Sequence, residues 1–442
     1  MKALFTQIII HLISVLIFLP VVVCSADNVK TTWGGQIKAS FSAIQYDNDS
    51  IQSEFKNDQW FDTDTDLRIK TRTFFNDNLS LDCHYALAYS KGDSIKASNF
   101  FVKNQPESSI SNIFRNNFDN DYTKLMDLSS KIKGGDDYFA NHRLDRLNLS
   151  LDSDFGRVVI GRQAVTWGNG ILFNPMDIFN PFSPYDTERD YKKGHDMAYF
   201  EAFFKRGDDL QFIYVPRRDA KDGNIKFSES SIGFKYHFFP NNIGIDNIKL
   251  DNMEFDFMVA EHYEDNLAGI GYAGTLGNAV VRSDIIYTFA GGDTKENFLN
   301  FIANIDYSWE WFKKNLYGFI EYYYSGLGVD DYSKALTDPD LSERISRGEL
   351  YGFGKNYLSS GIRIELNPLL NFNFTAIANL NDPSFLLQPG ITWDAAQNIE
   401  ITVSSNFTIG GKNDEYGQIQ IPSSTKSVDR GSSLFLWITM FF

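Results

Sequence analysis

The sequence has few cysteines, few histidines and no catalytic signature, and each shortage excludes a class of protein. Only 2 of the 442 residues are cysteine and 6 are histidine. Cys24 directly follows the N-terminal apolar run, in the part expected to be cleaved, so the mature chain keeps only Cys83, which excludes an intrachain disulfide and a cysteine-based metal site. The histidines are scattered without the HExxH spacing, and no GxSxG motif occurs. We therefore predict no catalytic residues, no metal site and no cofactor, and we expect a protein that is not an enzyme.

Positive charge is also scarce. The chain has 41 lysine and arginine residues against 57 aspartate and glutamate residues, a formal net charge of −16. Binding to nucleic acid needs a basic surface that neutralises phosphates. We therefore predict no nucleic-acid partner.

Long apolar runs are missing everywhere except at the N-terminus. Residues 8–23 form one apolar run that follows Lys2 and precedes the small residues of "CSA". This order is typical of a secretory signal peptide, so we predict a cleaved signal at residues 1–26 and one mature domain at residues 27–442. The mature part has no run of about 18 or more apolar residues, the length that a membrane-spanning helix needs.

The mature chain instead alternates between apolar and polar residues. In "LNFNFTAIANL", residues 370–380, Leu370, Phe372 and Phe374 fall on one strand face, and Asn371 and Asn373 fall on the other. About 18 such segments recur, each about 10–12 residues long, which is typical of strands with lipid on one side and a polar lumen on the other. We predict an all-β fold, a transmembrane antiparallel up-and-down β-barrel of about 18 strands (16–20). The count is even, so both termini should be periplasmic.

The spacing between the segments alternates between long and short. The long connections lie near residues 45–63, 91–137, 168–195, 326–354 and 410–431, and all of them follow odd-numbered segments. Single-chain bacterial barrels place short turns on the periplasmic side and longer loops outside. These five segments are therefore predicted to be outer loops, with the fold of residues 100–135 left open.

The last strand carries a recognisable pattern. Apolar residues alternate up to the end of "SSLFLWITMFF": Leu434, Leu436, Ile438, Met440 and Phe442. Together with the signal peptide and the alternating strands, this resembles a Gram-negative outer-membrane β-barrel of the porin type. The resemblance implies location in the outer membrane, contact with lipid and lipopolysaccharide, and recognition of the last strand by the barrel-assembly machinery. A monomer and a homotrimer both fit it.

The polar faces of several strands carry charges that a barrel would direct into its lumen. In "DLRIKTRTFF" three cations share one face, and we call Arg68, Lys70 and Arg72 the basic ladder. The further predicted pore-lining residues are Arg143, Arg146, Arg157, Arg162, Glu254, Asp256, Asp284, Asp306, Arg363 and Glu365. A basic wall opposite acidic residues would set the selectivity of a pore, whereas charges that pair with one another would only fill the barrel.

The segment "GRQAVTWGNGILFNPMDIFNPFSPYD", residues 161–186, is unusually apolar for an exposed loop. It is predicted to form a constriction or a mouth loop through Trp167, Phe173, Pro175, Asp177, Phe179, Pro181 and Phe182. Its "GRQ…WG…NP" pattern resembles uncharacterised porin-like proteobacterial outer-membrane families, and loosely the alginate-export barrels. Whether the loop enters the lumen stays open at this point.

The sequence as a whole predicts an outer-membrane pore for passive diffusion of small hydrophilic solutes, anionic or sugar-like. Two alternatives stay open. One is a structural or assembly barrel that is sealed by residues 168–195 and holds a periplasmic or surface partner. The other is a channel for apolar solutes.

Overall fold

The fold was analysed in a computed structural model of the chain. It describes residues 29–56, 58–104, 121–179, 181–187, 191–205, 207–240, 253–292, 295–336, 338–422 and 424–442. The predicted signal peptide lies outside these residues. Within them, no helix is both long enough and apolar enough to cross a membrane.

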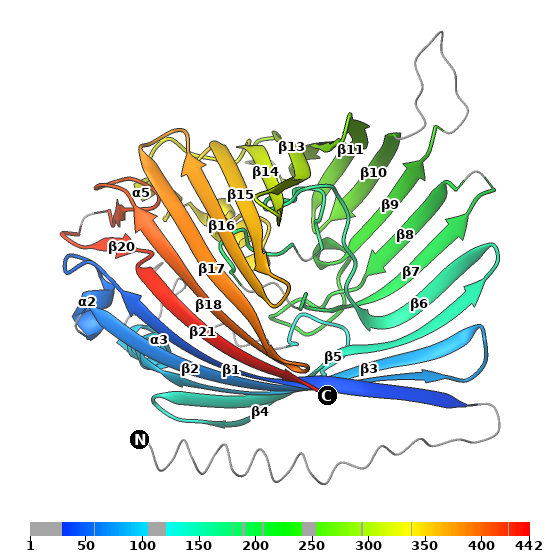
Figure 1. The fold of residues 1–442 in the computed structure, drawn as a ribbon, viewed down its shortest axis with the longest axis horizontal. Helices are drawn as coiled ribbons and strands as arrows, with labels where there is room; N and C mark the ends of the chain where they lie inside the picture. Colours follow the sequence, from blue (N-terminus) through cyan, green and yellow to red (C-terminus); the bar gives the residue numbers. More distant parts are fainter. Residues whose placement is uncertain are drawn as a thin grey trace.

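Eighteen antiparallel strands form one closed barrel, which confirms the predicted fold class (Figure 1). Each strand pairs with the next along the chain, and β21 closes the ring between β18 and β1, as the red and blue strands show in Figure 1. The barrel strands are β1 (Lys30–Gln45), β2 (Gln59–Phe74), β3 (Leu79–Gly92), β5 (Tyr138–Ser153), β6 (Gly156–Gln163), β7 (His195–Phe203), β8 (Asp209–Val215), β9 (Ser231–Phe238), β10 (Met253–His262), β11 (Asp265–Leu276), β12 (Ala279–Phe289), β13 (Phe298–Trp311), β14 (Lys314–Ser325), β15 (Asn356–Asn367), β16 (Leu370–Asn379), β17 (Ser384–Ala396), β18 (Ile399–Ile409) and β21 (Ser432–Phe441).

The long and short connections separate to opposite ends of the barrel. The five long connections predicted from the sequence all lie at one end, which we call the long-loop end, because consecutive strands run in opposite directions. β1 starts and β21 finishes at the other, short-turn end, where Gly35 and Phe442 exchange two backbone hydrogen bonds. Two of the predicted loop ranges differ from the structure: β2 already begins at Gln59, inside the predicted loop 45–63, and β6 ends at Gln163, before the predicted loop 168–195.

The long loops have secondary structure of their own. Residues 122–132, "YTKLMDLSSKI", have a helix-like pattern, but they form a turn and the start of a short strand that pairs beside β5. Residues 105–120, also in the segment left open from the sequence, lie outside the described residues. The loop elements are α2 (Gln52–Phe55), α3 (Asp93–Asn104), β4 (Ser129–Gly134), η1 (Phe227–Glu229), α5 (Tyr332–Ala335), α6 (Pro339–Arg347), β19 (Gln418–Gln420) and β20 (Ser427–Asp429).

The two faces of the strands differ as a membrane barrel requires. On β21, Leu434 is 50% exposed and Ile438 is 43% exposed on the outside, whereas Trp437 is 7% exposed and Thr439 is 3% exposed on the inside. The exposed outer face continues around the barrel with Phe257, Ile285 and other large apolar residues. Without lipid this belt would be an apolar surface far larger than soluble proteins expose.

A β-bulge in β5 changes which residues face the lumen. Pairing with β3 shifts by one residue between Leu144 and Arg146, so Asp145 is the inserted residue. A bulge lets two neighbouring residues share one face. Arg143, Asp145 and Arg146 therefore all reach the same side of the wall, which strict alternation would not allow.

Candidate functional site

The connection between β6 and β7, residues 164–194, enters the lumen, and we call it the inner loop. Its described residues contact the inside of the wall at β8, β12, β14 and β17. An apolar loop inside a barrel needs apolar wall residues to pack against, and the wall supplies them at single positions within otherwise polar faces. This settles the question that the sequence left open.

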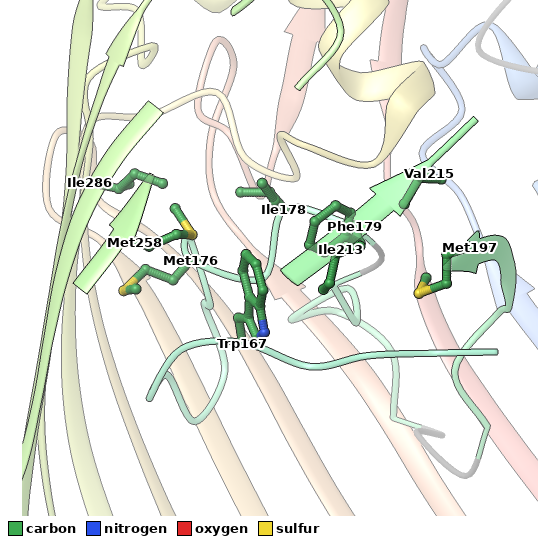
Figure 2. Close-up of a cluster of buried hydrophobic side chains, with 9 residues drawn as sticks. All are labelled: Trp167, Met176, Ile178, Phe179, Met197, Ile213, Val215, Met258 and Ile286. Atoms are coloured by element: carbon green, nitrogen blue, oxygen red, sulfur yellow. The ribbon is translucent and has the colours of Figure 1, made fainter. Parts of the chain in front are cut away.

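One side of the inner loop packs into a buried cluster, shown in Figure 2. Trp167 is at its centre, with its ring edge-on to Phe179 at 5.2 Å between ring centroids. The indole Nε1 donates a hydrogen bond of 2.7 Å to Gln211 Oε1 on β8, so the polar atom of this buried ring is satisfied. The wall contributes Ile213, Met258 and Ile286 among other residues of the cluster.

The tip of the inner loop packs against the opposite part of the wall. Phe173 stacks on Tyr323 of β14 with 4.5 Å between ring centroids, and Ile377 and Leu386 complete this side of the cluster. The wall residues of both clusters sit on faces that read as polar in the sequence. Pro175 and Pro181 line a small cavity at the long-loop end, and Phe182 is half-buried.

Two buried carboxylates hold the backbone of the inner loop. Glu321 on β14 is fully buried and accepts hydrogen bonds from the backbone N–H groups of Ile171, Leu172 and Phe173 at 2.6, 3.0 and 2.9 Å. Asp284 on β12 accepts from the backbone N–H and the side-chain amide of Asn169 at 2.6 and 2.8 Å. Glu321 was missed by the sequence reasoning, although it is an acidic residue on the inner face of a strand.

A third contact joins the two arms of the inner loop. Lys192 Nζ donates to the backbone oxygen of Val165 at 2.8 Å and to Thr166 Oγ1 at 2.9 Å, and it forms an ion pair with Asp177. Burial lowers the pKa of Lys192, and the Asp177 carboxylate opposes this change. The loop is thus fixed both to the wall and to itself.

The basic ladder lies where the inner loop returns to the wall. The Tyr191 ring stands over the Arg68 guanidinium, with 3.5 Å between ring centroid and Cζ, and 4.6 Å from Arg146 Cζ. Lys70 Nζ is 5.6 Å from the same centroid. Burial raises the pKa of Tyr191 while the two arginines oppose this, so the ring stays neutral and its face attracts cations.

Several carboxylates lie among the cations of the ladder. Asp145 accepts from Arg68 at 2.5 Å and from Arg143 at 2.7 Å, and Arg72 pairs with Asp82 at 2.9 Å. Arg68 also has Asp66 at 3.7 Å. The described cations here are Arg68, Lys70, Arg72, Arg143 and Arg146, and the described carboxylates are Asp66, Asp82 and Asp145. We call these eight residues, with Tyr191, the basic wall.

Three of the predicted lining arginines, Arg157, Arg162 and Arg363, do not belong to the basic wall. Arg162 is 1% exposed, because it forms ion pairs with Asp196 at 2.8 Å and Asp121 at 2.7 Å inside the wall. Its role is therefore to join β6 and β7 to the loop that carries Asp121. Arg157 is exposed and pairs with Asp152 across β5 and β6, away from the inner loop.

The predicted acidic residues differ more from expectation. Asp256 pairs with Lys235 at 3.3 Å, and Asp306 pairs with Arg282, each on its own part of the wall. Asp284 likewise bonds to Asn169. These three carboxylates therefore bond to neighbouring residues and do not form a free acidic row opposite the basic wall. Glu254 lies 3.6 Å from His237, Glu365 accepts from Asn315 at 2.9 Å, and Arg363 lies on β15. Among the described residues, no cluster of three or more His, Cys, Asp or Glu is arranged to hold a metal ion.

Three solved structures share the architecture over almost the whole chain. OccK5 (OpdH) of Pseudomonas aeruginosa has a TM-score of 0.53 at 8% identity, covering 94% of this chain and 98% of that one. Pseudomonas aeruginosa OccK2 (OpdF) in complex with glucuronate has a TM-score of 0.51 at 9% identity, covering 93% and 98%. A BenF-like porin from Pseudomonas fluorescens Pf-5 has a TM-score of 0.50 at 9% identity, covering 93% and 98%. No family model and no curated protein matched the sequence. The likeness shows a common porin-type barrel.

Proposed function

We propose that this protein is a passive outer-membrane channel for small hydrophilic solutes, with a preference for anions. The observation that carries the proposal is the basic wall at the point where the inner loop narrows the lumen. A ring or row of fixed charge at a narrow part of a pore favours ions of the opposite sign. Barrels of 16–18 strands are also wide enough for an aqueous channel.

Two further observations support the proposal. The exposed apolar belt on the outside of the barrel fits a lipid bilayer. The structurally similar OccK2 is described in complex with glucuronate, a small hydroxylated anion of the class that a basic wall would favour. The channel needs no cofactor and performs no catalysis in this proposal.

The proposed outer-membrane channel also implies an orientation and a set of partners. The long-loop end faces outward with its acidic loops near lipopolysaccharide, and both termini are periplasmic. The last strand, ending at Phe442, is read by the barrel-assembly machinery. The oligomeric state, monomer or homotrimer, is decided by the mass of the detergent-solubilised barrel.

The experiment is single-channel recording of the refolded barrel in a planar bilayer with a salt gradient. The wild-type reversal potential should mark anion preference. The triple variant Arg68→Gln, Lys70→Gln, Arg72→Gln should move it toward the cation side, because it removes three positive charges from the basic wall. Lys133→Gln, on the exposed strand β4, is the matched control and should leave it unchanged. A folded barrel without current, or a variant with the wild-type reversal potential, would contradict the proposal.

A second candidate function is a sealed barrel that holds a partner. The inner loop is fixed by buried contacts, and Glu415, in the loop after β18, is fully buried and bonded to Tyr357 and Asn379. Such a closed mouth favours a structural role, and the absence of current would support it. A channel for apolar solutes is less well supported, because the apolar side chains of the inner loop pack against the wall.

A further inference from the structure

The lumen has a second polar region, which adjoins the basic wall where Lys38 on β1 lies opposite Asp66 on β2. A cavity of about 300 Å³ is bounded by β1, β15, β16, β17, β18 and β21, with Thr187 of the inner loop at its edge. We call it the polar chamber. Its volume lies at the lower end of the range for small-molecule sites, about 300–1,000 Å³, so it suits a solute the size of a single sugar ring.

Strand register arranges the chamber wall in two neighbouring rows. In the first row Asn371, Thr392, Thr402 and Trp437 lie side by side on four adjacent strands. The Asn371 amide and the two threonine hydroxyls can each donate and accept hydrogen bonds. Trp437 adds an aromatic ring beside them. The Thr402 and Thr392 hydroxyl oxygens are only 3.3 Å apart, so both point to the same side.

The second row carries the charges. Asp394, Glu400, Thr439 and Lys38 are cross-strand neighbours on β17, β18, β21 and β1. Arg363 enters from β15 beside Asn373 and contacts Asn371 through its Nε at 3.4 Å. The chamber thus contains two cations and two carboxylates, and its formal charge is zero, unlike that of the basic wall.

Two of these charges have no counterion close by. Among the residues that the structure describes, neither the Arg363 guanidinium nor the Asp394 carboxylate forms an ion pair, whereas Asp256, Asp306 and Arg72 do. Strands lie about 4.8 Å apart, and β16 separates β15 from β17, so the two backbones are about 10 Å apart across the sheet. The pairing register adds a further offset along the strands. Both groups are therefore free to bond to a solute between them.

We propose that the polar chamber is a binding station for a neutral, polyhydroxylated solute of monosaccharide size. Hydroxyl groups donate and accept at once, which matches a wall of amides, hydroxyls, a guanidinium donor and carboxylate acceptors. An apolar part of the solute would contact the portion of Trp437 that lines the chamber, beside Phe435, which stacks on this ring at 5.3 Å between centroids, and Lys38, whose Nζ lies 5.7 Å from the centroid. A chamber with no net charge gives an anion no advantage there. The proposal rests on the proposed function, because the solute reaches the chamber through an open lumen.

Binding is tested in detergent by titrating the refolded barrel with glucose and following tryptophan fluorescence. A saturable change is expected, and it should disappear in Trp437→Phe. The double variant Asn371→Ala, Asn373→Ala should raise the dissociation constant about fivefold or more, because each lost hydrogen bond costs about 0.5–1.5 kcal/mol. Asn141→Ala, on β5 outside the chamber, should leave it unchanged.

The same titration with glycine and with acetate tests the solute class. Tighter binding of either of these than of glucose would overturn the proposal, and so would a glucose response that is not saturable or that survives in the double variant. The unheated electrophoretic mobility of each variant shows whether it has folded. Since binding is measured without current, a barrel that binds glucose but passes no ions would refute the channel and leave the station. A conducting barrel without saturable binding would refute the station alone.

Discussion

Replacing Glu321 with alanine should loosen the inner loop and raise the single-channel conductance. The carboxylate is the acceptor for three backbone N–H groups, of Ile171, Leu172 and Phe173, in a fully buried position. Each buried donor left without an acceptor costs about 1–3 kcal/mol, so the three together cost about 3–9 kcal/mol. Water from the lumen will reach part of the loop, which places the effect near the lower end, about 3–5 kcal/mol.

A loss of about 3 kcal/mol or more raises the undocked population of the loop more than a hundredfold. The inner loop also keeps its contacts through Asn169, Trp167 and Phe173, so it should fluctuate and not leave the lumen. Planar-bilayer recordings of Glu321→Ala should therefore show a larger mean conductance and more open-channel noise than the wild type. Glu321→Gln keeps one acceptor oxygen and should give an intermediate result.

The control is Glu310→Gln, an exposed residue near the end of β13 that removes the same charge without touching the inner loop. Its conductance should match that of the wild type. If Glu321→Ala folds and conducts like the wild type, then either the carboxylate does not hold the loop or the loop does not limit the current. Either result would refute the reasoning.

Three further predictions concern the charges around the lumen. Asp145→Asn should make the channel more anion-selective in reversal-potential measurements, because Arg68 and Arg143 lose their shared carboxylate; a shift toward cations would contradict this. Asp121→Asn should destabilise the barrel by about 3–5 kcal/mol, the cost of breaking a buried pair with Arg162. The measurement is the temperature at which the folded band disappears on gels of samples heated stepwise, and this temperature should be lower than for the wild type. Burial raises the pKa of Asp121, but Lys124 and Arg162 outweigh it and lower the pKa below 3.8. The difference in stability between wild type and variant should therefore reach its full size above about pH 4 and shrink as the pH falls below that. A stability difference that grows in acid would refute the assignment.

The barrel itself could be predicted because each strand is marked by alternation of apolar and polar residues within its own short segment. Alternation within each strand and the length of each connection gave all eighteen strands, and errors at the ends of β2 and β6 reflect weak signals at strand ends. The interior could not be predicted in the same way. Arg162 looks like a lumen residue by its place in a strand, yet its partners Asp121 and Asp196 come from two other segments.

The wall positions that the inner loop contacts could not be predicted for a related reason. Ile286 and Ile377 are apolar residues on otherwise polar strand faces, and the sequence alone does not indicate that a loop packs on them. The bulge at Asp145 adds a residue that simple alternation assigns to the wrong face. Information about such contacts is spread over residues that are far apart in the chain.

That separation also sets an order of events during assembly. Asp284 follows Asn169 by 115 residues, and Glu321 follows Ile171 by 150. The inner loop can therefore dock only once β12 and β14 stand in the wall. Until then its backbone donors and its aromatic rings need temporary protection, so the partly built barrel is the stage most exposed to misfolding and to proteolysis within residues 164–194.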